Sequence, residues 1–204
     1  MPLAIDCQPF GLNAGKPVAG ARGKLAPMSL RKVMKYFRSY DKAAYEVAAC
    51  QGSEPSESDV AAFEAEVGFG LEAEFREFTM GPLGGLYMAV REEIWPRPEP
   101  YEVGPFWTFL YGLKVPGIAR NIPEWLDVRV EWRRMQEIGI TDLVPCLRIC
   151  GDADVWCVDW KGRIVRWSHE EPEERRVEKV GFGKLLWREI GELEGRLERR
   201  RGMA

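Results

Sequence analysis

The chain has 204 residues, of which 46% are hydrophobic and 30% charged, and it carries a net charge of −3. This length and balance predict a folded protein with one sizeable core and exclude a disordered chain. The weak acidic charge provides no positive field for nucleic acid or an anionic membrane, so direct binding to either is not expected.

The sequence has no stretch near the roughly 18 consecutive apolar residues of a membrane span, and its start lacks the pattern of a signal peptide. A cytoplasmic location is therefore expected. The five cysteines are an odd number in a chain of medium size, which predicts reduced thiols and excludes a disulfide scaffold.

The first part of the chain divides into an arm and a helix. Residues 1–27 are rich in glycine, alanine and proline without periodicity, which predicts a flexible or extended arm. From Met28 to about Cys50 apolar residues recur at helical spacing, which predicts an amphipathic helix within residues 28–52. Its basic outer side is more typical of a solvated face than of a partner site. Residues 53–204 are expected to form the main domain.

Two more helices and a strand are expected next. Ser56 and Asp59 have the spacing of a capping box and predict the start of a second helix, which Gly68 interrupts. A short helix should follow through Phe75 and Phe78. The run "GLYMAV" then indicates a strand.

The second half predicts a helix, a meander and a closing helix. A helix is expected from about Pro123, with Trp125, Val128, Trp132 and Met135 on one face. In "LVPCLRICGDADVWCVDWKGRIVRWSHE", three β-forming runs are separated by turn residues, which is typical of an antiparallel meander. After the acidic turn "EEPEE", apolar residues at helical spacing from Phe182 to Leu197 predict the last helix.

The segment "EEIWPRPEPYEVGPFWTFLYG", from Glu92 to Gly112, combines prolines, aromatic residues and acids. Its prolines alternate at steps of two, whereas a PxxP ligand needs steps of three. Alternating prolines favour an extended backbone, and the aromatic rings supply area for packing. A stiff structural loop is expected, and its outward charged groups next to aromatic residues would suit protein binding.

Most patterns that could carry chemistry are incomplete. "GLNAGK" lacks the spacing and the hydroxyl residue of a phosphate-binding loop. Cys146, Cys150 and Cys157 lack the second cysteine pair or the several histidines that a zinc site needs, and half-buried thiols that pack as small hydrophobic groups are the simpler interpretation. His169 is the single histidine and lacks a nucleophile motif. No cofactor is expected.

Asp152, Asp154 and Asp159 leave two interpretations open. "GDAD" is typical of a tight turn, because glycine and aspartate tolerate unusual backbone angles. The same three aspartates could hold a divalent ion or act as an acid and base pair. A metal-dependent enzyme that uses them therefore remains an alternative.

The order of several motifs resembles the SUKH superfamily of the Smi/Knr type. These are "DVAAFEAEVGFGLEAEFREF", "GPLGGLYMAV", "EEIWPRP", "GPFW", "IPEWLDVRVEW" and the "VPC...GD...CVDW...GRIVRW" meander, over about residues 55 to 195. The first 50 or so residues lie outside the resemblance, and Leu83 precedes Gly84 and Gly85 where members often have asparagine. The resemblance implies an α+β fold, with helices around a central and largely antiparallel sheet, and no cofactor.

The resemblance also implies a function in protein binding. Many bacterial members are immunity proteins that bind a cognate toxin domain, often a nuclease or deaminase, and occlude its active site. Others act as housekeeping regulators or scaffolds, which is the alternative. The family has no catalytic set to transfer. The mild acidic balance would suit a basic partner, and the residues that we expect at the contact are Glu92, Glu93, Trp95, Arg97, Glu99, Trp125 and Asp127.

Overall fold

The structure is a computed structural model, and it describes residues 27–98, 105 and 109–203. Within these residues, seven strands form one antiparallel sheet in which neighbours in sequence are also neighbours in space. The expected α+β class with a central antiparallel sheet is therefore confirmed. The strands are β1 (Tyr45–Ala48), β2 (Leu86–Val90), β3 (Gly112–Val115), β4 (Leu143–Ile149), β5 (Val155–Asp159), β6 (Ile164–Trp167) and β7 (Arg175–Val177).

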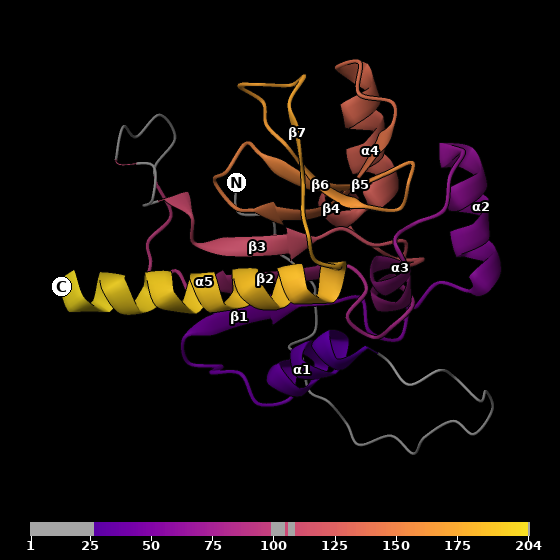
Figure 1. The fold of residues 1–204 in the computed structure, drawn as a ribbon. Helices are drawn as coiled ribbons and strands as arrows, with labels where there is room; N and C mark the ends of the chain where they lie inside the picture. The colour runs from indigo at the N-terminus through magenta and orange to yellow at the C-terminus, as the bar shows by residue number, and fades with distance from the viewer. Residues whose placement is uncertain (1–26, 99–104, 106–108, 204) are drawn as a thin grey trace.

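Helices lie on and around this sheet. They are α1 (Met28–Phe37), α2 (Glu57–Val67), α3 (Ala73–Thr79), the 3-10 turn η2 (Glu124–Leu126), α4 (Val128–Glu137) and α5 (Phe182–Met203). The long α5 crosses the sheet in front of β1 to β3, with α1 beside β1 (Figure 1). The helices α2 and α4 stand at the end of the molecule away from the C-terminus (Figure 1).

Alternation along the strands gives the sheet two faces. One face presents apolar residues such as Met88, Leu113 and Ile149 to α1, α3 and α5, and we call it the main-core face. Phe182 at the start of α5 contacts the rings of Phe75 and Phe78 in α3, at centroid distances of 5.1 and 5.3 Å. Burying side chains of this size stabilises a fold by about 2 kcal/mol each, so this face anchors α5.

The opposite face carries a row of paired residues across the strands. Tyr87 lies opposite Lys114, Lys114 opposite Arg148, and Arg148 opposite Val155. The helix α4 packs over this side through Met135, which joins a smaller apolar cluster of the sheet. We call it the α4 face. Its half nearest β2 and β3 is polar, which sets it apart from the main core.

The helix predicted within residues 28–52 is wrong beyond Phe37. The chain turns after α1, and Tyr45–Ala48 is the edge strand β1, paired with β2. Local spacing favours a helix there, but burial of Tyr45 and Val47 against the sheet outweighs that local preference. Both α1 and β1 contribute to the same core as residues 53–203.

The prediction around Pro123 is correct only in part. The α-helix begins at Val128 rather than near Pro123, and Asp127 caps it by accepting a hydrogen bond from the backbone N–H of Arg129 at 2.9 Å. Pro123 instead precedes the short turn η2, which places Trp125 away from the buried stripe of α4.

Other expected elements are confirmed. Ser56 and Asp59 form the capping box of α2 through reciprocal hydrogen bonds. The short helix is α3, "GLYMAV" contains β2, the three meander runs are β4, β5 and β6, and the last helix is α5. The strands β3, of four residues, and β7, of three, were not expected. The predicted arm, residues 1–27, lies outside the described residues except for Pro27.

Candidate partner-binding surface

A buried carboxylate organises the polar half of the α4 face. Glu131 of α4 has a side chain that is 3% exposed, and it reaches toward the row of residues on β2 to β4. Its Oε1 lies 3.2 Å from Lys114 Nζ, and its Oε2 lies 2.8 Å from Arg148 Nε. Arg134, one turn further along α4, lies 3.0 Å from Oε1. The single carboxylate of Glu131 therefore forms ion pairs with three cationic side chains.

The charge state of Glu131 follows from these contacts. Burial by itself would raise the pKa of this carboxyl group, but the attraction of Lys114 and Arg148 outweighs burial, and the pKa lies below the ordinary value of 4.5. Glu131 is therefore ionised at neutral pH. Lys114 Nζ also donates to the backbone carbonyl of Trp125 at 3.2 Å, which ties η2 to the sheet.

A second charged pair lies beside the first. Arg97 Nη2 donates to Glu46 of β1 at 2.8 Å and to the backbone carbonyl of Val90 at 2.8 Å. Its guanidinium lies 4.0 Å from the ring centroid of Tyr111, a cation–π geometry. The side chain of Arg97 is 22% exposed, so this contact holds Arg97 in a defined, half-buried position.

Aromatic rings and a thiol join the two charged pairs. Tyr87 and Trp125 pack edge to face with centroids 5.4 Å apart. Burial raises the pKa of the nearby Cys150 thiol to about 11, although Lys114 and Arg97 both act to lower it. We call the whole set the sheet-face cluster. It comprises Glu46, Tyr87, Arg97, Tyr111, Lys114, Trp125, Glu131, Arg134, Arg148 and Cys150.

The structure brings two of the sequence-predicted contact residues into this cluster, namely Arg97 and Trp125. Glu92 and Glu93 are exposed in the turn after β2. Trp95 is only 3% exposed, and its ring packs in the main core with Arg200 of α5 at 4.9 Å. Trp95 is thus placed as a core residue rather than as an exposed anchor.

The two remaining contact residues have different outcomes. Asp127 caps α4 and pairs with Arg129 at 2.8 Å, so its carboxylate already has a structural role. Glu99 lies outside the described residues. The cluster residues that the sequence reasoning missed come from β1, β2, β3, β4 and α4 and from the chain next to β3 and β4. Charged residues inside otherwise apolar strands, Lys114 in "GLKV" and Arg148 in "CLRIC", were the available signal.

The three meander aspartates do not form one cluster. Asp159 is at the opposite end of β5 from Asp154, where it closes the β5–β6 turn and pairs with Arg163 at 2.6 Å. Asp152 and Asp154 share Arg166, at 3.3 and 3.1 Å. The alternative of one site that uses Asp152, Asp154 and Asp159 together therefore has no matching geometry. Among the described residues, no group of three His, Cys, Asp or Glu side chains is placed to hold a metal ion.

His169 has one defined partner. Its Nδ1 lies 3.2 Å from Asp154 Oδ1, and its side chain is 51% exposed. Burial would raise the pKa of Asp154, but hydrogen bonds from His169 and Ser168 outweigh burial and lower it. Ser168 is thus engaged with the aspartate, whereas a nucleophilic serine needs the histidine as its base.

The described cysteines are Cys50, Cys146, Cys150 and Cys157, and they are free thiols. Burial is the main cause of the raised pKa of Cys146, and it raises the pKa of Cys157 to about 12. These two side chains pack as small apolar groups, as the sequence indicated, but they are fully buried rather than half-buried.

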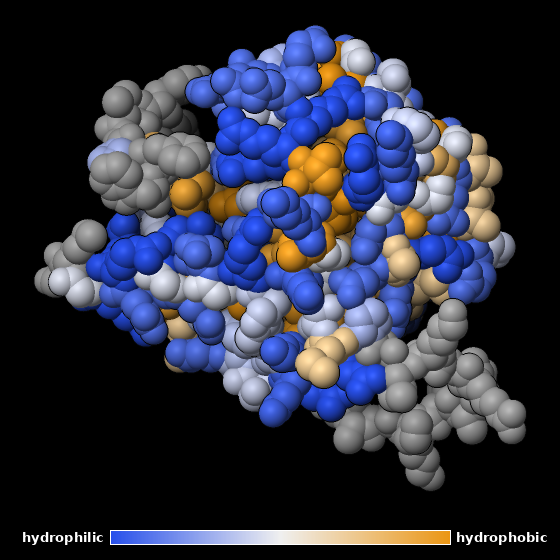
Figure 2. Space-filling model, in the orientation of Figure 1, coloured by the Kyte–Doolittle hydropathy of each residue, from blue (hydrophilic) through white to orange (hydrophobic). Residues whose placement is uncertain are grey.

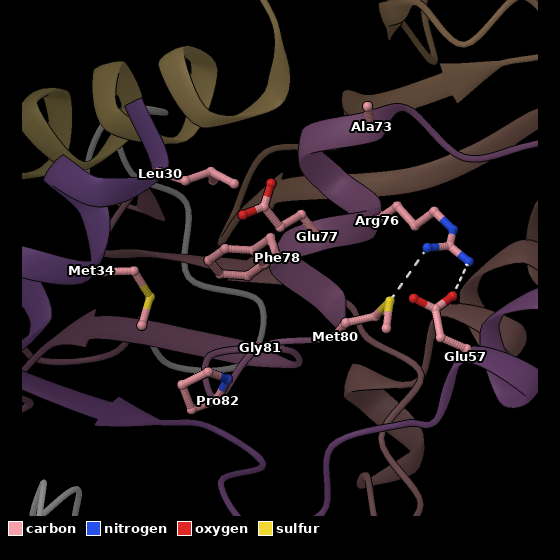
Figure 3. A pocket seen from close by; sticks show the side chains of 10 residues that line it. All are labelled: Leu30, Met34, Glu57, Ala73, Arg76, Glu77, Phe78, Met80, Gly81 and Pro82. Atoms are coloured by element: carbon pink, nitrogen blue, oxygen red, sulfur yellow. Dashed lines mark hydrogen bonds and ion pairs between the residues drawn. The ribbon is translucent and has the colours of Figure 1, made fainter. Parts of the chain in front are cut away.

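An apolar groove of about 680 Å³ lies outside the cluster, between α1 and α3. Leu30 and Met34 of α1 approach it from one side, and Phe78 and Met80 from the other (Figure 3). At one end Arg76 donates to Glu57 at 2.6 Å. The lining offers apolar contacts and few polar groups.

An apolar area lies between α5 and β7. Figure 2 shows apolar side chains there, with polar side chains around them. All three residues of β7 are exposed, and Val177 is 46% exposed. Nothing in the described part of the chain indicates what would cover this area.

No family model matches the chain, and no curated protein matches it. In the described part of the chain, no helix has the length and apolar character needed to cross a membrane.

Proposed function

We propose that this chain is a non-enzymatic, intracellular protein-binding domain of the SUKH type. More specifically, we propose an immunity protein that binds a cognate toxin domain and occludes it. The observation that carries the proposal is the sheet-face cluster, where aromatic rings and charged groups are fixed in half-buried positions. Such preorganised anchors lose little conformational entropy on binding and are typical of the energetic centres of protein interfaces.

The cluster supports binding better than it supports catalysis. Each charged group in it has a partner within the fold, as Glu131 does with Lys114 and Arg148. The Cys150 thiol, with its pKa near 11, is a poor nucleophile at neutral pH. The resemblance of the motifs to the SUKH superfamily supplies the toxin-binding part of the proposal.

The test is an affinity capture of the tagged full chain from its host, followed by a functional assay. We expect one stoichiometric partner with a toxic C-terminal domain, and we expect equimolar protein to inhibit that domain. Trp125→Ala should weaken capture, because Trp125 lies in the cluster. Trp160→Ala is the matched control, because Trp160 is 59% exposed at the β5–β6 turn, outside the cluster.

Three outcomes would contradict the proposal. A captured partner whose activity is unaffected by equimolar protein would oppose occlusion. Recovery of only cell-wall or signalling proteins would favour the housekeeping regulator of the Smi/Knr type. Equal loss of capture in both tryptophan variants would place the interface away from the cluster.

A further inference from the structure

The sheet-face cluster contains more cationic than anionic side chains. Lys114, Arg134 and Arg148 all rely on the single carboxylate of Glu131, and Arg97 relies on Glu46. The exposed Glu124 lies 3.8 Å from Arg134 and offsets part of the excess. Even with Glu124 included, cations outnumber carboxylates in a chain whose net charge is −3.

Glu92 also acts on Tyr111, but its side chain is exposed, so water screens its charge more than that of the half-buried cations. Two other neighbouring acids are already paired. Asp127 is paired with Arg129, and Asp142 is paired with Arg175. Each of these pairs is neutral by itself. The positive charge at the cluster is therefore a local property of the α4 face, and it is opposite in sign to the charge of the whole chain.

Burial increases the energetic effect of this excess. The side chains of Lys114 and Arg148 are 21% and 22% exposed, so part of their hydration is lost, yet both remain accessible from solvent. A carboxylate that approaches such half-buried cations gains more than it would at a fully exposed pair, because water screens the interaction less.

We propose that the sheet-face cluster binds an acidic segment of a protein, with an Asp or Glu side chain placed on the solvent side of Lys114 and Arg148, because Glu131 already lies between them. The inference rests on the proposed function and specifies the chemistry of the partner at that surface. The packed rings of Tyr87 and Trp125 supply an apolar surface beside these charged groups. Their edge-to-face packing and the negative net charge of the chain favour a protein segment over a nucleic acid, which needs stacking faces and a broad positive surface.

The test uses two labelled decapeptides, one alternating Glu and Tyr and the other alternating Gln and Tyr, titrated with the full chain. We expect the Glu peptide to bind at least about threefold more tightly, with an advantage that falls as salt is raised. A labelled single-stranded decanucleotide is titrated in parallel. Equal affinity for the two peptides, or tighter binding of the oligonucleotide, would overturn the inference.

Matched variants on α4 locate the effect. Arg134→Gln should weaken binding of the Glu peptide about threefold, while Glu131 keeps its ion pairs with Lys114 and Arg148. Arg133→Gln removes the same charge from the next residue, which is 58% exposed and reaches toward Glu66 at 3.9 Å, so affinity should not change. Lys114→Gln should weaken binding about tenfold. Equal effects of the two arginine variants would overturn the inference.

The result is separable from the proposed function. If a toxin is captured and inhibited but its affinity is unchanged by Arg134→Gln, the inference is wrong and the function stands. If the Glu peptide binds selectively but no toxin is captured or inhibited, the inference stands and the immunity function is wrong.

Discussion

At the scale of single residues, Glu131 is expected to contribute strongly to stability. The change Glu131→Gln would leave Lys114, Arg134 and Arg148 without their shared carboxylate, two of them at half-buried positions. We expect a loss of about 3 kcal/mol in the free energy of unfolding, measured by urea denaturation. Glu137→Gln, at an exposed position of the same helix, is the control and should change stability by less than about 0.5 kcal/mol.

The same residue predicts a pH dependence. The pKa of Glu131 is lower in the folded protein than its ordinary value of 4.5. Its contribution to stability is therefore complete above pH 4.5 and is lost as the pH falls below that value through the folded pKa. The stability difference between the wild type and Glu131→Gln should be constant near neutral pH and shrink in acid. A difference that persists unchanged at about pH 3 would contradict this assignment.

The raised pKa values of the Cys146, Cys150 and Cys157 thiols predict slow alkylation. Burial raises the pKa of Cys150 to about 11 and that of Cys157 to about 12, so thiolate is scarce in the native protein at pH 8. Iodoacetamide should modify these residues and Cys146 at least about a hundredfold more slowly in buffer than in urea, as measured by mass spectrometry of peptides. Because Cys150 is only half-buried, rapid native labelling of it would contradict its raised pKa.

At the scale of elements, α5 contains two glycines with opposite expectations. A Cβ at Gly191 would meet nothing within 4 Å, so Gly191→Ala should raise stability by about 1 kcal/mol through helix propensity alone. A Cβ at Gly183 would lie 2.8 Å from Ser29 Oγ and 3.0 Å from Glu74 Oε2. Gly183→Ala should therefore lower stability by about 1–3 kcal/mol. Thermal unfolding of both variants checks the pair, and equal shifts would contradict the packing of α1 and α3 on α5.

The elements also show where sequence reasoning succeeds. The capping box of α2, the meander and the closing helix carry strong local signals, and all three are confirmed. β1 was mistaken for helix because Ala44, Val47 and Ala48 continue the helical spacing of α1. Its strand conformation comes from pairing with β2, about 40 residues away in sequence, and local patterns do not contain that information.

At the scale of the whole molecule, the candidate site was only partly predictable, for the same reason. Arg97 and Trp125 were expected to lie at the surface that binds a partner, but their companions Glu46, Lys114 and Glu131 come from three other elements. The register of the sheet brings Tyr87, Lys114 and Arg148 into one row. The sequence specifies each charged residue, but the pairing of strands determines which charged side chains lie close together. Strand pairing therefore places more cations than carboxylates on the α4 face.

The unity of the core leads to a prediction about truncation. A fragment of residues 53–204 follows the boundary that the sequence suggested, but it lacks α1 and β1. Its β2 would become an edge strand, and the surfaces that bury Leu30, Phe37 and Tyr45 would be exposed. We expect this fragment to unfold without a cooperative transition, because deleting several fully buried side chains costs more than the roughly 5–15 kcal/mol stability of a typical domain.

A fragment of residues 27–204 keeps every described element and should unfold cooperatively in urea, monitored by tryptophan fluorescence and circular dichroism together. If residues 53–204 instead unfold cooperatively with the same midpoint, then α1 and β1 are an appendage and the core closes without them.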